Sequence, residues 1–578
     1  MLKHINRDKA FDFISVGALL AISILLSHRM LGGDVLVGSD GQYHIRWLVH
    51  FFDQIQAGNL YPRWLPHTNY GYGSPNFVFY SPLAYYLGSF FFAFGADIPR
   101  VLAGIYILSF SVGSVALYCF LKSLSGQRLP ALLAALLFAL SPFIIWDAYD
   151  RLALSSLLAT CLFPVLLWTT HLAATGEKYK LTLSFTSLII TISHPPSFIL
   201  FNLFWFPYLF WMYSSIPIRR KLEVCGYMVL GWGLAAFYLV PAALEKHLIS
   251  SDALKGVMGG ISNNIIGIET PKNNNSFVAV RKIWWSQLRF FITLAVLSFF
   301  TWKHRTERFI TPHKVVAVFL AVLFFTHKVS LSLWETIKPL EIIQFPFRLM
   351  PLLAVAIALL FYTLMAHKHV AWVRYLAIFL CLISLTLNLR YAKRLITDQP
   401  SYQEPRWITE LDVSHAQQRR LKEVSLAVSL PRETYLQLDE FPDVPEYRPF
   451  LETDRGIVPV EPRRDEPKVT IEDGRIERVV WNDLYRSAAV SSDRDTCLRF
   501  RTYVYPAWKA FLNGERASIS MASDGGIQVC VTAGDHLVEI EHSWTRAMYV
   551  GTAISALSLT TVAALFLRSF VQTRKDYG

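Results

Sequence analysis

Charged residues are scarce in this sequence: Asp, Glu, Lys and Arg make up only 17% of its 578 residues, whereas 53% are hydrophobic and 14% aromatic. The mean hydropathy of +0.35 is too high for a soluble globular chain of this size, so the composition indicates a membrane protein. The formal net charge of +12 does not point to nucleic acid, because Lys and Arg fall mostly in short runs between apolar segments. Charges that set membrane topology are distributed in this way.

Cysteine is also rare, with six residues in the chain. Four of them stand inside apolar segments, where we expect small hydrophobic groups: Cys119, Cys161, Cys225 and Cys381. The other two, Cys497 and Cys530, lie in polar sequence and could pair if their domain is outside the cytoplasm. Their spacing alone gives no geometry, so a disulfide and two free thiols both stay open.

Motifs that bind nucleotide phosphates are missing from the sequence. Gly71 and Gly73 have no strand-to-helix context and precede no Gly-Lys-Ser/Thr, so they do not predict a phosphate-binding loop. The sequence also lacks the repeated halves that are frequent in transporters.

Long apolar runs, in contrast, are abundant, and about twelve can span roughly 30 Å of hydrocarbon. They cover residues 11–31, 100–121, 130–146, 152–173, 181–194, 197–214, 223–243, 286–302, 315–331, 346–366, 371–390 and 547–568. The first is too long for a signal peptide and lacks a small-residue cleavage pattern, so we expect a retained helix. A further run, residues 77–95, must either cross the membrane or lie at its outer surface.

The positions of Lys and Arg decide between these alternatives. If residues 77–95 cross, Lys122 and Arg128 fall outside the membrane, and every later basic linker also moves to the outer side. If they re-enter or lie in the outer interface, all the basic linkers and the basic tail face the cytoplasm, which favours this assignment. It predicts a multi-pass protein of the cell (inner) membrane with both termini cytoplasmic, and it places loop 32–99 and the turn 147–151 outside.

The predicted fold is mainly α, with about twelve transmembrane helices and a C-terminal extracytoplasmic β-sandwich-like domain. Residues 1–394 form the multi-spanning membrane domain. Residues 395–465, rich in Pro, Glu and Arg, predict a linker with short elements. Residues 466–545 show alternating runs separated by Asp-Gly and Asn-Gly turn signals, which are typical of a small β-sandwich. Residues 546–578 form the final transmembrane helix and a short cytoplasmic tail.

The loop after the first helix carries a candidate acid–base pair. Asp40 stands at a predicted helix N-cap, and His44 follows one turn later on the same face. In the alternative interpretation, Asp40 only caps an amphipathic interfacial helix whose lipid face consists of Trp47, Phe51 and Phe52. A capping carboxylate can also act as a base, so the two interpretations are compatible.

Several motifs resemble those of a known family. They read Asp40-x-x-x-His, Gly58-Asn-Leu-Tyr-Pro-Arg-Trp, Gly71-Tyr-Gly-Ser-Pro, Tyr80-Ser-Pro-Leu and, further along the chain, Ile343-Gln-Phe-Pro-Phe-Arg-Leu. On these motifs the chain resembles the bacterial membrane proteins labelled 6-pyruvoyl-tetrahydropterin synthase-related. That label suggests a pterin enzyme, but no residue pattern in the chain supports a pterin cofactor. The architecture of these proteins in turn resembles the GT-C glycosyltransferases, which use lipid-phosphate-linked sugars outside the membrane.

The resemblance implies one acidic residue in the first outer loop and a second acidic site about a hundred residues later. Asp40 matches the first position, and Asp147 and Asp150 match the second. Asp40 would remove the proton of an acceptor hydroxyl, or bind the acceptor, with His44 as its partner.

The leaving lipid phosphate gains negative charge in such a transfer, and basic side chains can neutralise it. Arg151 and Arg348 are the available cations. Arg348 follows Gln344, itself a substrate-binding candidate, and Pro346 at the outer start of a helix, where an Arg is a functional candidate. It could equally be an ordinary helix-end Arg whose guanidinium extends to the interface.

Four more residues are substrate-binding candidates, each with a plainer alternative. Glu245 could be a solvated carboxylate at a helix end, and His194, before two prolines, could have a structural role at a helix break. Tyr72 and Tyr80 could stack on sugar or isoprenoid, or belong to an interfacial aromatic belt.

Metal dependence stays open. The loop has Asp40-Gly41-Gln42 and not the Asp-x-Asp pair of several GT-C patterns. An Asp/His pair could bind a divalent cation, but two ligands do not define a metal site.

The resemblance therefore implies a membrane glycosyltransferase that moves a sugar from a polyprenyl-phosphate carrier to a glycan, lipid or protein acceptor of the cell envelope. A transporter or flippase of a lipid-linked intermediate is the alternative, although the acids gather at the outer edge and not at the bilayer midplane. A non-catalytic envelope scaffold is the third possibility.

Overall fold

The computed structural model describes most of the chain. The described residues are 2–577 without 37, 177–178, 250–260, 268–274, 301–310, 338–339, 341–342, 344, 367–370, 399–442, 454–455 and 465. The linker expected at 395–465 therefore lies largely outside the described residues.

Helices dominate the first 398 residues. In chain order they are α1 (Leu2–Leu26), α2 (His28–Leu31), α3 (Gly41–Gln56), α4 (Asn76–Phe79), α5 (Leu83–Ala93), α6 (Ile98–Ser125), α7 (Arg128–Ala139), α8 (Pro142–Tyr149), α9 (Leu154–Thr175), α10 (Lys180–Thr191), α11 (Pro195–Pro207), α12 (Ile218–Leu234), α13 (Ala236–Leu244), α15 (Asn275–Phe300), α16 (Pro312–Thr326), α17 (Leu331–Thr336), α18 (Met350–Ala366) and α19 (Ala371–Asp398). A last helix, α23 (Arg546–Tyr577), follows the β-domain.

Eight helical segments of the described chain are long and apolar enough to cross a membrane. They are Arg7–Leu26, Ile98–Ser125, Arg128–Tyr149, Leu154–Thr175, Ala279–Phe300, Pro346–Met365, Ala371–Asp398 and Arg546–Arg568. The bent pair α12–α13, with an angle of 74°, could add a ninth. The expected number of about twelve is not confirmed, because α10, α11 and α16 have only 12, 13 and 15 residues. Pro195 explains the early end of α10, since the residue before a proline avoids helical geometry.

Residues 77–95 do not form a long helix. They contain most of α4 and all of α5, and the 11 residues of α5 extend only about 16 Å. That length is too short to cross about 30 Å of hydrocarbon. The segment packs instead against α3, where the rings of Phe51 and Tyr86 lie 5.0 Å apart.

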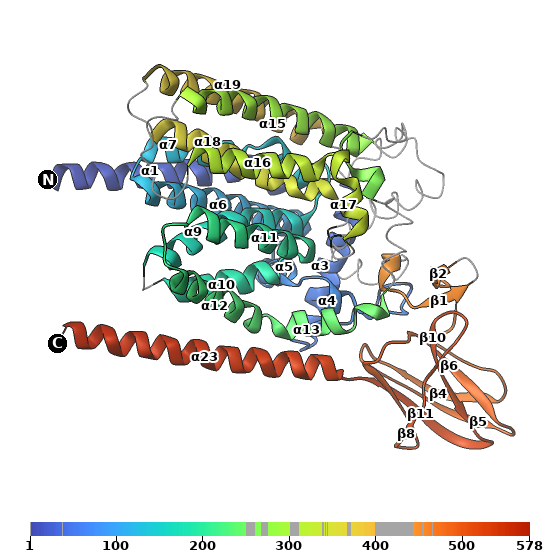
Figure 1. Cartoon of the computed structure of the whole chain (residues 1–578). Helices are drawn as coiled ribbons and strands as arrows, with labels where there is room; N and C mark the ends of the chain where they lie inside the picture. Colours follow the sequence, from blue (N-terminus) through green and yellow to red (C-terminus); the bar gives the residue numbers. More distant parts are fainter. Residues whose placement is uncertain are drawn as a thin grey trace.

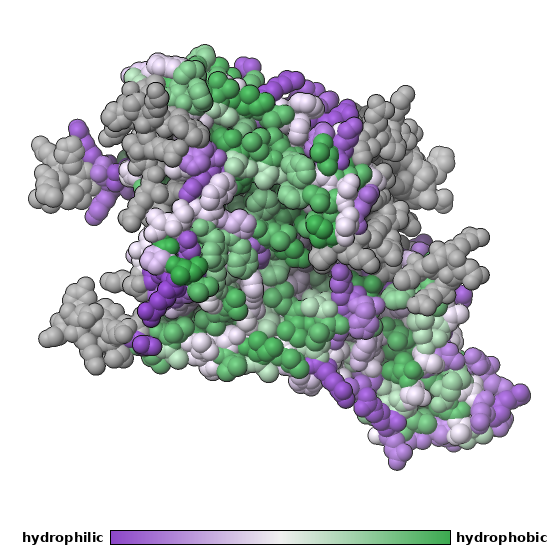
Figure 2. Space-filling model, in the orientation of Figure 1, coloured by the Kyte–Doolittle hydropathy of each residue, from purple (hydrophilic) through white to green (hydrophobic). Residues whose placement is uncertain are grey.

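The long helices run roughly side by side, and both chain termini lie at the same end of the bundle (Figure 1). The short helices α3, α4, α13 and α17 and the β-domain lie at the opposite end (Figure 1). Apolar side chains cover much of the visible bundle, whereas hydrophilic side chains gather on the outer part of the β-domain (Figure 2). The polar loop and the β-domain thus share one end of the molecule.

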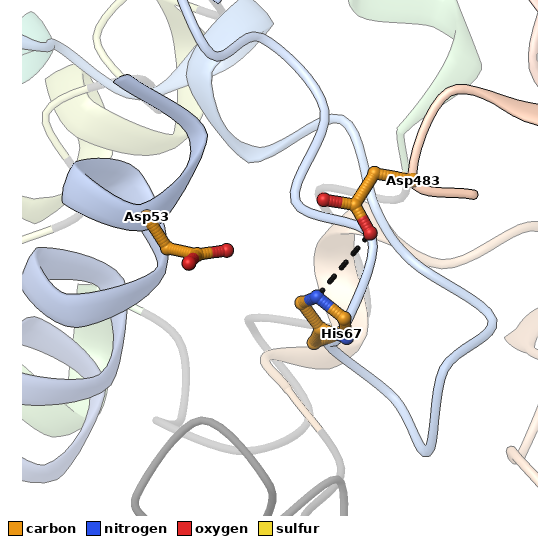
Figure 3. Close-up of side chains that lie close together, drawn as sticks. All are labelled: Asp53, His67 and Asp483. Carbon is orange, nitrogen blue, oxygen red and sulfur yellow. Dashed lines mark ion pairs between the residues drawn. The ribbon is translucent and has the colours of Figure 1, made fainter. Parts of the chain in front are cut away.

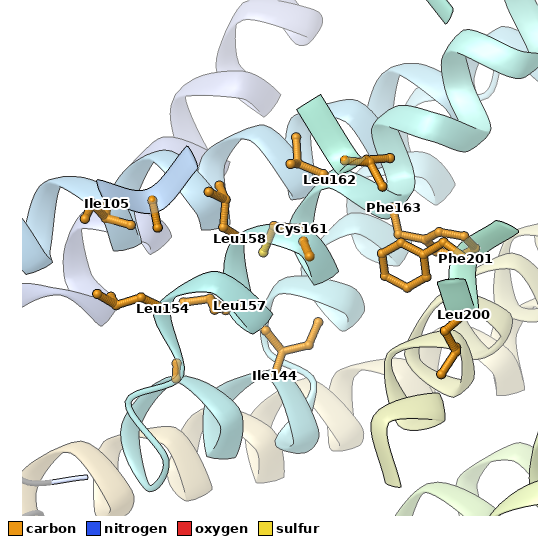
Figure 4. Close-up of a cluster of buried hydrophobic side chains, with 14 of the residues drawn as sticks. Ile105, Ile144, Leu154, Leu157, Leu158, Cys161, Leu162, Phe163, Leu200 and Phe201 are labelled. Atoms are coloured by element: carbon orange, nitrogen blue, oxygen red, sulfur yellow. The ribbon is translucent and has the colours of Figure 1, made fainter. Parts of the chain in front are cut away.

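The bundle interior is filled by aliphatic and aromatic side chains. Figure 4 shows Leu158 and Cys161 of α9 between neighbouring helices, with Phe163 against Phe201 of α11, ring centroids 4.5 Å apart. Cys161 is buried among these groups, as expected for a small hydrophobe. Gly113 of α6 allows this packing, because a Cβ there would lie 2.9 Å from the Cys161 carbonyl oxygen.

The C-terminal domain consists of antiparallel sheets. Its strands are β1 (Phe450–Thr453), β2 (Gly456–Pro459), β3 (Val469–Ile471), β4 (Arg475–Trp481), β5 (Tyr485–Ser492), β6 (Thr496–Tyr503), β7 (Trp508–Leu512), β8 (Glu515–Ala517), β9 (Ser520–Met521), β10 (Gly526–Val531) and β11 (Gly534–His542). Strands β1 and β2 form a hairpin, and the others form sheets of order β3-β6-β10-β9 and β4-β5-β11-β7-β8. The side chain of Arg486 on β5 donates a hydrogen bond to the Arg501 carbonyl on β6, which links the two larger sheets.

One local prediction in this domain is confirmed, and one open question is answered. The turn between β7 and β8 is Asn513-Gly514, with φ of +52° and +85°, which matches the left-handed geometry of tight hairpin turns. Cys497 and Cys530 face each other on β6 and β10 and form a disulfide.

Candidate functional site

Asp40 and Asp147 are joined by one arginine. The guanidinium of Arg151 donates from Nη2 to Asp40 Oδ2 at 2.7 Å and from Nη1 to Asp147 Oδ1 at 2.6 Å. The side chain of Asp147 is 2% exposed, that of Arg151 10% and that of Asp40 24%. The structure therefore brings together the two acidic segments that the sequence placed on one face, and it leaves the Asp40 carboxylate the most accessible of the three groups.

Two glycines allow the loop and the turn to approach this closely. A Cβ at Gly38 would lie 2.5 Å from the Leu152 Cβ and 2.8 Å from the Arg151 carbonyl, and a Cβ at Gly41 would lie 2.6 Å from the Leu152 side chain. Backbone hydrogen bonds fix the contact: the amide of Asp40 donates to the Arg151 carbonyl at 2.9 Å. The turn itself is strained at Leu152, whose φ is +55°.

Asp40 occupies the N-cap position of α3, as predicted, but its side chain does not cap the helix. Its carboxylate instead pairs with Arg151 and accepts a hydrogen bond of 3.1 Å from the Ser39 hydroxyl. The interpretation of Asp40 as only a helix cap is therefore wrong.

The proposed lipid face of α3 is also wrong. Trp47, Phe51 and Phe52 are 3%, 0% and 4% exposed, because the protein itself covers them. Trp47 donates to the carboxylate of Asp443 at 3.0 Å, and Phe52 stacks on Phe92 of α5 with centroids 5.3 Å apart.

His44 lies beneath Asp40 in an aromatic environment. Its Nδ1 shares a hydrogen bond of 2.7 Å with the Tyr85 hydroxyl, and its ring lies 6.0 Å from the Tyr80 ring. Burial lowers the pKa of His44 to about 4, against the attraction of Asp40. The imidazole is therefore neutral at physiological pH and can exchange hydrogen bonds without carrying charge.

Asp40 is ionised at the same pH. Burial, the largest single influence, raises the pKa of its carboxyl, but Arg151, His44, the Ser39 hydroxyl and Arg348 together outweigh it, so the net shift is downward. Burial also raises the pKa of Tyr80 well above its ordinary value, and the charge of Asp40 adds to this shift. The site thus combines a fixed carboxylate with neutral hydrogen-bonding groups.

Arg348 stands at the rim of the same site. Its Nη1 donates to the Ile343 carbonyl at 2.8 Å, and its guanidinium lies 4.8 Å from the Phe345 ring centroid. Phe347 lies 5.6 Å from the Arg151 guanidinium, so the 345–348 segment covers Arg151 with aromatic surface. The charges of Arg151 and Arg348 both lower the pKa of Asp40.

His194 lies on the far side of Tyr80. Its ring is 6.5 Å from the Tyr80 ring, and its Nδ1 shares a hydrogen bond of 2.8 Å with Ser197. It precedes α11 without capping it. Because His194 lies beside Tyr80, it remains a candidate substrate-binding residue at the edge of the site.

Other candidates lie elsewhere. Glu245 accepts a hydrogen bond from Tyr505 of the β-domain. Tyr72 donates to Asp524 at 2.6 Å and packs on Tyr503, so it also contacts the β-domain. Both residues therefore help to hold the β-domain against the membrane domain.

Two further candidates are Asp150 and Gln344. Asp150 supplies its backbone carbonyl to the Ser39 amide at 3.3 Å. Gln344 lies outside the described residues.

Two site residues escaped the sequence analysis. Tyr85 lies in a segment read only as apolar surface, and no spacing pattern marks it as the partner of His44. Asp443 is 2% exposed and accepts from Asn76 at 2.7 Å as well as from Trp47. It comes from the predicted linker, where a single acid among many polar residues carries no signal.

The arrangement can hold a polar substrate group at one place. Asp40 offers a partly exposed anionic oxygen, and the buried Oδ2 of Asp147 has no hydrogen-bond partner among the described residues. A hydroxyl could donate to such oxygens, and an anionic group could bind near Arg348. A cation bound between Asp40 and Asp147 would have to displace Arg151, so this pair is a poor metal site.

Comparison with known proteins gives one family match. The model of the 6-pyruvoyl-tetrahydropterin synthase related domain, described as a membrane protein, matches residues 77–396, more than half of the chain. No curated protein matches the chain.

Several solved structures are similar at low TM-score. The cryo-EM structure of arabinofuranosyltransferase AftD from Mycobacteria is 17% identical with a TM-score of 0.44, and covers 66% of this chain and 27% of its own. The oligosaccharyltransferase of Archaeoglobus fulgidus, crystallised with Zn and sulfate, is 16% identical with a TM-score of 0.35, and covers 74% of this chain and 58% of its own. The chain thus spans about a quarter of the length of the mycobacterial protein.

Proposed function

This chain belongs to the 6-pyruvoyl-tetrahydropterin synthase-related family of membrane proteins, and we propose that it is a glycosyltransferase acting on the outer face of the membrane. The donor is a sugar carried on polyprenyl phosphate, and the acceptor is a hydroxyl of an envelope glycan, lipid or protein. The observation that carries the proposal is the bridge of Arg151 between Asp40 and Asp147. It assembles a carboxylate, cations and aromatic groups beside the start of α3. Helix α3 lies at the end of the bundle that carries the β-domain (Figure 1).

Asp40 acts on the acceptor in this proposal. Its exposed oxygen accepts the hydrogen bond of the acceptor hydroxyl and takes the proton as the hydroxyl oxygen bonds to the anomeric carbon. A positioned carboxylate of this kind contributes about 10²–10⁴-fold in rate. Arg151 holds Asp40 in place and keeps it ionised, and His44 supports the same end of α3 through its hydrogen bond with Tyr85.

Arg348 acts on the donor. As the bond from the anomeric carbon to the phosphate oxygen breaks, its electron pair stays on the phosphate, and the guanidinium stabilises that charge. Its place at the start of a long apolar helix suits a phosphate whose polyprenyl chain remains in the bilayer. Tyr80 and His194 border the site where the sugar would lie between donor and acceptor.

No pterin chemistry forms part of the proposal. The bridged carboxylates suit an acceptor with hydroxyl groups, not the binding of a planar heterocycle.

The test is a transfer assay on the purified full-length protein in liposomes that contain polyprenyl-phosphate-linked radiolabelled sugar. We expect label to move to an added envelope-type acceptor. Movement of the lipid-linked sugar across the bilayer without any transfer would contradict the proposal and identify a flippase.

A further inference from the structure

A second cluster of polar side chains lies where the polar loop meets the β-domain. Asp53 comes from the last turn of α3, His67 from the loop that follows, and Asp483 from the turn between β4 and β5. The three side chains point toward one another across a small gap (Figure 3). None of them takes part in the Asp40–Arg151–Asp147 site.

The geometry of this cluster matches a cation site. One ligand atom from each residue lies within 4.8 Å of the others, and His67 Nε2 lies 3.4 Å from Asp483 Oδ1. Ligand atoms bound tetrahedrally at about 2.1 Å stand about 3.4 Å apart. His67 and Asp483 therefore already have the spacing of two ligands, and Asp53 offers a third ligand atom within 4.8 Å of both. The side chains of His67 and Asp483 are about one third exposed, at 32% and 35%, so an ion can reach them.

A buried histidine beside the cluster gives an independent indication. His50 is only 3% exposed, and its Nδ1 has no hydrogen-bond partner among the described residues. Its ring lies 5.6 Å from the His67 ring, and it precedes Asp53 by three positions on the same face of α3. A buried polar atom without a partner is costly, and a metal-bound water would supply that partner.

A neighbouring amide holds the β-domain ligand in place. Gln54 Nε2 donates to Asp483 Oδ2 at 2.5 Å, which leaves Oδ1 directed to His67. Such bonds orient the ligands of metal sites and contribute to metal affinity.

Positive charge also lies near the cluster. Arg486 is stacked on Trp481 at 4.0 Å and donates to the Arg501 carbonyl, and its charge favours the ionised form of Asp483. Arg46 stands one turn before His50 on α3. Two carboxylates outweigh this charge when a dication binds between them.

We propose that Asp53, His67 and Asp483 bind a divalent transition-metal cation of the Zn²⁺ type, with His50 as hydrogen-bond partner of a metal-bound water. Mg²⁺ and Ca²⁺ prefer shells of oxygen only, whereas imidazole with carboxylates suits Zn²⁺. Asp483 belongs to the β-domain, and the other two ligands belong to the loop 32–99. The bound cation therefore links the β-domain to this loop. This site is independent of the proposed transfer reaction.

Titration calorimetry with Zn²⁺ on the detergent-solubilised full-length chain, free of affinity tags, tests the site. We expect one Zn²⁺ per chain and at least tenfold weaker binding in both Asp53→Asn and Asp483→Asn. Asp493→Asn, an exposed acid in the next turn of the β-domain, is the matched control and should bind like wild type. Unchanged affinity in both ligand variants, or equal affinity for Mg²⁺, would overturn the proposal.

The unfolding temperature with and without Zn²⁺ is a second measurement, which also applies to variants whose folding is altered. Zn²⁺ should raise the unfolding temperature of wild type and of Asp493→Asn, but not that of Asp483→Asn. An equal rise in all three proteins would place the bound ion elsewhere and overturn the assignment.

Discussion

Arg151 donates a hydrogen bond to Asp40 across 111 positions of sequence, and the same guanidinium holds Asp147 one helical turn before it. This pair joins the first polar loop to the turn between α8 and α9. It both positions the Asp40 carboxylate and compensates the buried charge of Asp147.

Removal of the bridging arginine should destabilise the protein strongly. Arg151→Met leaves the buried carboxylate of Asp147 without its cation, and loss of one partner of a buried ion pair costs about 3–5 kcal/mol. We expect a marked drop in the unfolding temperature, measured by intrinsic fluorescence in detergent.

The double variant Arg151→Met/Asp147→Asn controls for this effect. It removes the uncompensated charge as well, so its stability should recover a substantial part of the loss. A double variant as unstable as the single one would mean that the arginine stabilises the fold by packing and not by charge.

Gly38→Ala should separate the loop from the turn. The added Cβ would lie 2.5 Å from the Leu152 Cβ and 2.8 Å from the Arg151 backbone, so one segment must shift and lengthen the Asp40–Arg151 pair. We expect at least a tenfold loss of transfer activity, because misplacement of a reacting group by about 1 Å costs about 10²-fold. Gly17→Ala in α1 is the matched control, since its Cβ meets nothing within 4 Å; equal activities of the two variants would contradict the account.

The stability of the protein should depend on His44 at acidic pH. The pKa of His44 is lowered to about 4 in the folded protein, against 6.5 for the ordinary side chain. As the pH falls below 6.5, His44 becomes protonated in the unfolded chain, but in the folded chain it stays neutral down to about pH 4. The free energy of unfolding therefore decreases between these two pH values.

Denaturation of wild type and His44→Gln at several pH values measures this contribution. The wild type should lose more stability than the variant between pH 7 and pH 4. Parallel curves for the two proteins would show that His44 does not titrate in this way.

Tyr72→Phe should loosen the β-domain. The Tyr72 hydroxyl donates to Asp524, a buried carboxylate that also pairs with Arg499. Loss of a hydrogen bond to a buried charged group costs about 1.5–3 kcal/mol. Hydrogen–deuterium exchange should rise in the loop around residues 68–74 and at the turn 522–526, while Tyr549→Phe, an exposed tyrosine of α23, should leave both unchanged. Identical exchange in the two variants would contradict the docking role of Tyr72.

Sequence reasoning predicted the class of fold because composition and turn chemistry act locally. The β-domain and its Asn513-Gly514 turn followed from alternation and turn pairs. The pairing of Cys497 with Cys530 stayed open, because only the register of β6 against β10 brings the two side chains together. Charge placement in the flanking segments predicted that residues 77–95 do not cross the membrane, and the 11 residues of α5 are too few to cross it.

The contacts within the site could not be predicted in the same way. The sequence placed Asp40 and Asp147 on one face, but their contact through Arg151 depends on two glycines that fit against Leu152. The apolar face of α3 was wrongly assigned to lipid. An apolar stripe in the sequence does not show whether lipid, α5 or the β-domain covers it. Asp443 was missed since its role arises only from long-range contacts with Trp47 and Asn76.

The most direct test of the central claim is the rate of sugar transfer from a polyprenyl-phosphate donor by Asp40→Asn and Asp147→Asn, compared with the surface variant Asp493→Asn. The account predicts that Asp40→Asn loses about 10²–10⁴-fold in rate, that Asp147→Asn is also strongly impaired, and that Asp493→Asn transfers like wild type. Wild-type rates in both Asp40→Asn and Asp147→Asn would contradict it.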